Sequence, residues 1–208
     1  MEKHKITVEK TARYFTLGEI SPKVKTVLFV CHGYSQLADE FISGFKEIEN
    51  GKILIVAPEG LHRFYTRGHE HVVASWMTRE EREDDIRDYV LFLDKVYLEV
   101  MKSIFDAKII VLGFSQGAAT ASRWAGMGKS SIDELILWCG FFPPDMQPEE
   151  MPDDISLTVV TASNDKFIPE AQEKSQMEKM KELFPRLKHV RFEGEHLVDV
   201  EVLRKMIL

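Results

Sequence analysis

Residues 108–124 read KIIVLGFSQGAATASRW, and this stretch decides the fold class. Lys108–Leu112 is an apolar, β-branched run that predicts a buried strand. Gln116–Gly126 is rich in alanine and glycine, which predicts a helix able to lie close against a sheet. The residues between them, Gly113 to Gly117, form a glycine-bounded turn. A strand that turns sharply into a helix is the repeating unit of a parallel sheet covered by helices.

The rest of the chain repeats this alternation and predicts an α/β protein with a mostly parallel central sheet. Continuous apolar runs are typical of strands covered on both faces. The candidate strands, which are mostly runs of this kind, are Lys108–Leu112, Thr26–Cys31, Ile53–Ala57, Glu134–Trp138, Leu157–Thr161 and Lys188–Phe192. Helical spacing is found at Ala38–Glu49, Arg82–Ser103, Glu170–Phe184 (with Pro169 at its start) and Leu197–Leu208.

The N-terminal stretches ITVEK (6–10) and ARYFTLG (12–18) alternate polar and apolar residues and predict an antiparallel strand pair at the edge of the sheet. Pro58–Glu81 and the proline-rich Gly140–Ser156 are longer than ordinary connections, and such loops often carry binding surfaces. A length of 208 residues, 44% of them apolar, favours one domain over residues 1–208.

Composition narrows the class of function. A net charge of −7 argues against nucleic acid and stable membrane association, because both reward a basic face. Cys31 and Cys139 each end an apolar run, where buried free thiols commonly lie, although sequence alone leaves a disulfide open. The N-terminus lacks the apolar core of a signal peptide, so we expect a soluble, cytoplasmic protein.

Ser115 is the candidate nucleophile. A GxSxG pattern alone is a weak signal, but a preceding strand and a following helix make it strong, because the turn exposes the serine hydroxyl. The alternatives are a chance serine in a glycine-bounded turn and a phosphate-binding loop; no GxxxxGK[ST] sequence is present to support the second.

A serine nucleophile needs a base and an orienting carboxylate, and both follow Ser115 in the chain. Asp165 comes shortly after the Leu157–Thr161 run, and His196 lies just beyond KHVRF (188–192). The alternatives are an Asx turn or helix cap for Asp165 and an ordinary surface histidine for His196. Asp145, Asp153 and Asp154 are weaker candidates for the acid, and His189 is expected to be structural.

Backbone amides complete the predicted site. The Gln116 N–H follows the nucleophile, and the Tyr34 N–H lies in the HGYS turn (32–35) after the first core strand; together they predict an oxyanion hole. We expect His32 to brace this turn. Trp76 and Met77 are candidate substrate-binding residues in the long loop, with core packing as the equal alternative.

Two polar groups have no assigned role. His69-Glu70-His71 looks like a metal pair but has no further ligands at a recognisable spacing, so we expect neither a metal nor a cofactor. Arg63, Arg67 and Arg79 could meet an anionic substrate group or pair with the acids of REEREDD (79–85).

Together these residues resemble the carboxylesterase/phospholipase family of α/β-hydrolases, which includes acyl-protein thioesterases. The likeness rests on HGYS, APEG (57–60), GFSQGA (113–118), NDKFIP (164–169) and GEH (194–196), and runs along nearly the whole chain. It implies an α/β-hydrolase fold and the triad Ser115, Asp165 and His196 with the oxyanion pair Tyr34 and Gln116. Ser35 is a departure, since the family usually has glycine there.

The sequence therefore predicts a serine hydrolase that cleaves small-molecule carboxylic esters or thioesters through an acyl-enzyme. A lactone or dienelactone hydrolase and a peptidase could use the same triad. The alternative from another class is a non-catalytic relative that binds a small molecule or a partner, which usually has lost a triad residue. The oligomeric state is left open.

Overall fold

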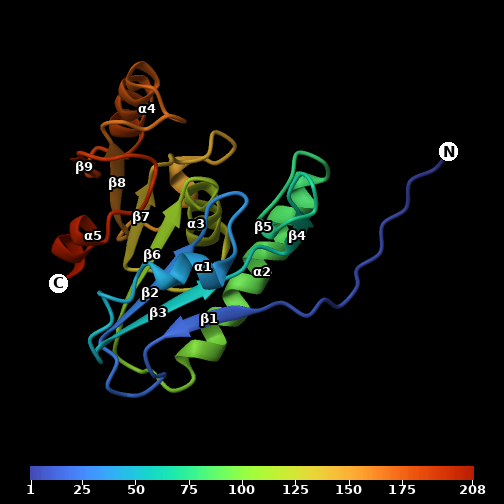
Figure 1. The fold of residues 1–208 in the computed structure, drawn as a ribbon, viewed down its shortest axis with the longest axis horizontal. Coiled ribbons are helices and arrows are strands. Elements are labelled where there is room, and N and C mark those ends of the chain that lie inside the picture. Colours follow the sequence, from blue (N-terminus) through green and yellow to red (C-terminus); the bar gives the residue numbers. More distant parts are fainter.

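The computed structural model describes residues 1–208, and its centre is a seven-stranded sheet with the strand order β1-β3-β2-β6-β7-β8-β9 (Figure 1). Every neighbouring pair is parallel except β1 and β3 at one edge. The strands are β1 Tyr14–Leu17, β2 Thr26–Cys31, β3 Ile53–Pro58, β6 Lys108–Phe114, β7 Glu134–Trp138, β8 Ser156–Ala162 and β9 Lys188–Phe192. The predicted mostly parallel α/β sheet is confirmed.

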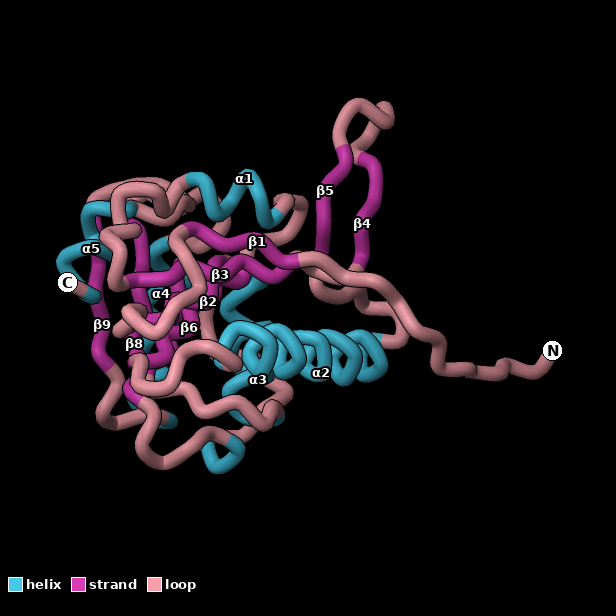
Figure 2. Tube along the Cα trace, turned by 90° about the horizontal axis from the view of Figure 1, so that it is seen from below, coloured by secondary structure: helices cyan, strands magenta, loops and turns pink.

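Helices cover both faces of the sheet, as predicted. They are α1 Ala38–Ser43, α2 Arg82–Met101, α3 Gln116–Met127, α4 Glu170–Leu183 and α5 Val200–Ile207, with a short 3-10 turn at Pro148–Glu150. One buried apolar cluster joins α2, α3 and α4 to one sheet face, and a second joins α1 and α5 to the other. Figure 2 shows α2 and α3 below the sheet and α1 and α5 above it.

An antiparallel strand pair lies at the N-terminal edge of the sheet, as predicted, but one of its two strands is not the one expected. The antiparallel pair at this edge is formed by β1 and β3, with Tyr14 opposite Pro58. Residues 6–10 hold no strand; they are exposed and belong to an arm that extends away from the body of the molecule (Figure 1). Alternation alone does not make a strand when no neighbouring edge pairs with it.

Two helices are shorter than their patterns suggested. α1 ends at Ser43 rather than Glu49, and Gly44 caps it with its amide directed to the Phe41 carbonyl, while Phe45 and Ile48 continue into the core through turns. α5 begins at Val200 rather than Leu197, because the Asp199 carboxylate accepts the Val202 N–H at 3.0 Å as an N-cap.

The long segment Pro58–Glu81 contains a two-stranded hairpin, β4 His62–Tyr65 and β5 Val72–Ser75, which the sequence pattern did not reveal. The hairpin stands away from the main sheet (Figure 2). The end of β5 contacts the turn after β2: the Ser35 N–H donates to the Ala74 carbonyl at 2.9 Å, and the Ala74 N–H donates to the Gln36 carbonyl at 3.2 Å. No helix is long and apolar enough to cross a membrane.

Candidate active site

The candidate residues lie where the parallel strands end. Tyr34 follows β2, Ser115 follows β6, Asp165 follows β8 and His196 follows β9. Carboxyl ends of parallel strands meet at one edge of a sheet, which is where open α/β sheets bind ligands. The topology therefore brings residues that are up to 162 positions apart, from Tyr34 to His196, to one edge.

Ser115 occupies a strained backbone conformation, with φ 54° and ψ −114°. Its amide donates to the Trp138 carbonyl at 2.9 Å, which fixes the turn to the end of β7. The flanking glycines are required sterically. A Cβ on Gly113 would lie 2.2 Å from the Gly117 carbonyl oxygen, and one on Gly117 would lie 2.1 Å from that of Cys31. Non-glycine residues hold such conformations mainly at functional sites.

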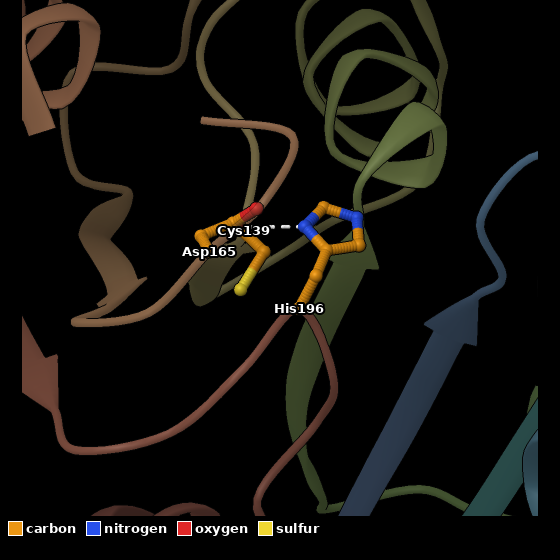
Figure 3. A group of neighbouring side chains, drawn as sticks. All are labelled: Cys139, Asp165 and His196. Carbon is orange, nitrogen blue, oxygen red and sulfur yellow. Dashed lines mark hydrogen bonds and ion pairs between the residues drawn. The ribbon is translucent and has the colours of Figure 1, made fainter. Parts of the chain in front are cut away.

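Asp165 and His196 are hydrogen-bonded: His196 Nδ1 lies 2.7 Å from Asp165 Oδ2 (Figure 3). A carboxylate can only accept, so Nδ1 carries the proton and Nε2 is left as the basic nitrogen. The other carboxylate oxygen, Oδ1, accepts the Phe167 N–H at 2.8 Å and the Ile168 N–H at 3.1 Å. The Asp165 side chain is 2% exposed and that of His196 14%, so the pair is shielded from water.

Two aromatic rings hold the His196 imidazole. Phe114 lies at a ring-centroid distance of 4.9 Å, and Phe167 at 4.7 Å. Phe114 is the residue before Ser115, so the imidazole packs directly beside the turn that carries Ser115. In the view of Figure 3 the second ring nitrogen faces the ribbon of α3, the helix that Ser115 caps.

The turn that carries Tyr34 is braced as predicted. His32 Nε2 accepts the Gly60 N–H at 2.9 Å, so its Nδ1 carries the proton and donates to the Gly33 carbonyl at 2.8 Å. Burial is the main cause that lowers the pKa of His32, which keeps it neutral. The Gly33 N–H is taken by Gln36 Oε1 at 2.7 Å, and Ser35 adopts φ 63°, the left-handed region that suits the glycine usual in the resembled family.

Both predicted oxyanion donors are available for a ligand. The Tyr34 N–H donates no hydrogen bond within the chain. Gln116 is the first residue of α3, where an N–H has no partner inside the helix. The Gln116 side chain has a role that the sequence did not reveal. Its carbonyl oxygen accepts the Trp76 N–H at 3.2 Å, and its amide nitrogen donates to the Met77 carbonyl at 3.1 Å. These bonds connect the residues after β5 to the turn that carries Ser115.

The side chains of Trp76 and Met77 are enclosed by other residues, which leaves little of their surface for contact with a substrate. Trp76 is fully buried, stacks on the His32 ring at 5.0 Å and donates from Nε1 to the His32 carbonyl at 2.8 Å. Met77 is half-buried and its sulfur lies 3.4 Å from Arg123 Nη1. These contacts favour the core-packing alternative for Trp76, whereas exposed aromatic rings near the site belong to Tyr34 and Phe167.

Cys139 is a neighbour of the site that sequence reasoning missed. It directly follows β7, with φ 46°, and its sulfur lies within 4.8 Å of ligand atoms of Asp165 and His196 (Figure 3). Burial, followed by the negative charge of Asp165, raises the pKa of Cys139 to about 12, so the group is a neutral thiol. Both oxygens of the Asp165 carboxylate already accept hydrogen bonds, from His196 and from two amides, so this carboxylate is committed to the histidine pair.

Three of the other polar residues singled out in the sequence have structural partners. Asp145 accepts two hydrogen bonds from Arg123, of 2.7 and 3.1 Å, and lies 2.9 Å from Arg82 Nη2. The carboxylate that binds His196 is that of Asp165, not that of Asp145. His189 Nε2 lies 2.8 Å from Thr161 Oγ1. Arg63 Nε lies 3.9 Å from Glu59 Oε1. Cys31 and Cys139 are both free and buried.

Comparison with known proteins agrees with this fold. The family model described as Phospholipase/Carboxylesterase matches residues 14–207. No curated protein matches the chain. Among solved structures, acyl-protein thioesterase 2 from Zea mays superimposes with a TM-score of 0.72 at 14% identity, covering 94% of this chain and 96% of that one.

Two further structures are similar. The esterase PE8 has a TM-score of 0.70 at 17% identity, with 95% of this chain and 98% of that chain covered. A phospholipase/carboxylesterase from Dyadobacter fermentans has a TM-score of 0.68 at 16% identity, with 97% and 98% covered. At such identities the likeness concerns the fold.

Proposed function

Because the chain belongs to the phospholipase/carboxylesterase family, we propose that it is a serine hydrolase. It cleaves carboxylic esters or thioesters through an acyl-Ser115 intermediate, and residues 1–208 form a single domain. The observation that carries the proposal is the 2.7 Å hydrogen bond between His196 Nδ1 and Asp165 Oδ2, made beside the strained Phe114–Ser115 turn. Acid, base and nucleophile are needed together for this chemistry.

The first half of the reaction forms the acyl-enzyme. His196 Nε2 takes the hydroxyl proton while Ser115 Oγ bonds to the carbonyl carbon, and the carbonyl oxygen becomes an oxyanion that accepts the Tyr34 and Gln116 N–H groups. As the bond to the leaving oxygen or sulfur breaks, His196 returns the proton to that atom. Asp165 stabilises the imidazolium formed in between.

In the second half, water replaces the leaving group. His196 Nε2 removes a proton from the water, whose oxygen attacks the acyl carbon, and the tetrahedral intermediate again rests on the two amides. Its collapse breaks the bond to Ser115 Oγ, which regains its proton from His196. The products are a carboxylic acid and an alcohol or thiol, and each step uses only residues of this chain.

A fluorophosphonate probe tests the nucleophile, because it phosphonylates only an activated serine. We expect the wild type and Ser103→Ala, a change in the exposed turn after α2, to be labelled equally, and Ser115→Ala not at all. Mass spectrometry of the labelled peptide identifies the modified residue. Absence of label on the wild type would favour the non-catalytic alternative, and equal label on Ser115→Ala would assign the chemistry to another serine.

A further inference from the structure

A cavity of about 300 Å³ adjoins the His196 ring on the side of α1. It lies between α1 with the turn that follows it, the end of β6, and the segment that leads from His196 into α5. Ser115 and Asp165 do not line it, and the roles proposed above leave it unused. Its volume corresponds to about ten water molecules at ~30 Å³ each. It is therefore large enough for a compact organic group.

The floor of this cavity is aromatic and its mouth is polar. Phe45 and Phe114 are buried, and Phe41 packs on both, at centroid distances of 5.2 Å from Phe45 and 5.9 Å from Phe114. The exposed residues Glu40 and Ser43 lie at the rim. The lining is therefore mixed, with aromatic rings that can contact an apolar body and polar groups beside them.

The position beside His196 points to one part of the substrate. Asp165 occupies Nδ1, so only Nε2 is left to return a proton to the departing atom, which must lie against the imidazole. His196 and Phe114 both line the cavity, and Phe114 immediately precedes the nucleophile. A group attached to the departing oxygen or sulfur thus has a preformed space next to it.

We propose that this cavity binds the leaving group of the substrate, an uncharged alcohol or thiol with an aromatic or branched aliphatic body. The inference rests on the proposed serine hydrolase function and extends it to substrate class. The aromatic floor favours the apolar body, while the Glu40 carboxylate at the rim disfavours an anionic leaving group.

Gly44 allows the cavity to be filled without disturbing the backbone. It lines the cavity with ordinary right-handed helical angles, φ −68° and ψ −16°. A Cβ there would meet only the Phe41 carbonyl oxygen, at 3.5 Å, an ordinary contact. Gly44→Trp therefore adds an indole at the cavity wall, Gly44→Ala adds only a methyl group, and Lys46→Trp places an indole on the exposed surface two residues away, outside the cavity.

Two ester series separate the leaving group from the acyl group. The first keeps the acetyl group and enlarges the leaving group from ethyl to phenyl to 2-naphthyl; the second keeps ethyl and lengthens the acyl chain from acetyl to octanoyl. For Gly44→Trp we expect kcat/KM on 2-naphthyl acetate to fall at least about tenfold relative to ethyl acetate, the scale of about 1.4 kcal/mol. Its dependence on acyl length should match the wild type, as should both profiles of Lys46→Trp.

The outcomes distinguish the cavity from the chemistry. A loss that follows acyl length, or that is equal in both series, overturns the leaving-group assignment while fluorophosphonate labelling of Ser115 still supports the hydrolase. A wild type that neither labels nor hydrolyses any ester overturns the proposed function and this inference with it. Circular dichroism of each variant checks that Gly44→Trp is folded; if it is not, Ser43→Trp on the same rim replaces it and is read by the same criteria.

Discussion

Asp165 presents its two carboxylate oxygens to different partners: Oδ2 lies 2.7 Å from His196 Nδ1, and Oδ1 accepts the amides of Phe167 and Ile168. This division predicts how asparagine would sit in its place. The two amides would hold the carbonyl oxygen of the asparagine, so its NH₂ group would have to face Nδ1. His196 would then carry its proton on Nε2 and could not accept one from Ser115.

We therefore expect Asp165→Asn to lower kcat by about 10³–10⁴-fold while the protein remains folded, since the hydrogen-bonding geometry is kept and only the tautomer changes. Steady-state hydrolysis of a chromogenic ester measures the effect. Asp153→Asn, a change to an exposed acid of the proline-rich loop, is the matched control and should keep wild-type activity. An Asp165→Asn enzyme within tenfold of the wild type would point to a different acid.

The glycines around Ser115 give a prediction for stability. A Cβ on Gly117 would lie 2.1 Å from the Cys31 carbonyl oxygen, and backbone of β2 cannot move aside cheaply. Overpacking of this kind costs about 1–3 kcal/mol and sometimes more. We expect Gly117→Ala to lower the free energy of unfolding by about 3 kcal/mol or to prevent folding. Denaturant titration measures it, with Gly44→Ala as control; similar curves for the two variants would contradict the steric argument.

The sheet could be predicted from the sequence because most of its strands are apolar runs. Thr26–Cys31, Glu134–Trp138 and Lys188–Phe192 have the bounds that the pattern indicated. The hairpin could not, because β4 and β5 have only four residues each, and the two polar residues that begin β4 leave it no apolar run. Residues 6–10 show the opposite case: their alternation predicts a strand, but they pair with no other strand and form none.

The site was predictable to the extent that its residues follow strand ends. Ser115, Asp165 and His196 each lie just beyond a strand, and the order of those strands in the sheet brings them to one edge. Contacts between side chains from different strands carry no sequence signal. Two contacts show this: the Gln116 side chain binds the Met77 carbonyl just after β5, and the Cys139 thiol lies beside Asp165. Each contact depends on which loops meet after folding.

A buried charge anchors the proline-rich loop. The Arg123 side chain on α3 is 5% exposed and donates two hydrogen bonds to Asp145 and one to the Tyr89 hydroxyl, at 3.2 Å. Removal of one partner from a buried ion pair typically costs about 3–5 kcal/mol, because the other charge stays buried. Asp145→Ala should reach this range, since it leaves the guanidinium without a carboxylate.

Urea unfolding of three variants checks this anchor. Asp84→Ala, which removes the surface contacts to Arg87 and Lys5, should lower the free energy of unfolding far less than Asp145→Ala and serves as the surface control. Arg123→Met should cost less than Asp145→Ala, because Asp145 is 26% exposed and keeps Arg82 as a partner. Equal small losses in all three variants would show that the buried pair contributes no more than a surface pair.

The neutral, buried His32 predicts a pH dependence of stability. Burial lowers its pKa in the folded protein, whereas in the unfolded chain the imidazole titrates near ~6.5. As the pH falls below about 6.5, the unfolded chain binds a proton that folded His32 resists, so the free energy of unfolding decreases. This stabilising contribution is complete above the unfolded pKa and is lost as the pH falls through the folded pKa.

His32→Gln isolates this contribution, because a glutamine carbonyl can accept the Gly60 N–H without titrating. We expect the free energy of unfolding of this variant to be lower than that of the wild type at pH 7 but to decline less steeply between pH 7 and pH 5. His189, whose pKa burial also lowers, is present in both proteins, so the difference between the two slopes reports His32 alone. His4→Gln on the exposed N-terminal arm should follow the wild type. Parallel profiles for His32→Gln and the wild type would mean that His32 takes up its proton in the folded protein as readily as in the unfolded chain, and the brace of the Tyr34 turn would then have to tolerate an imidazolium.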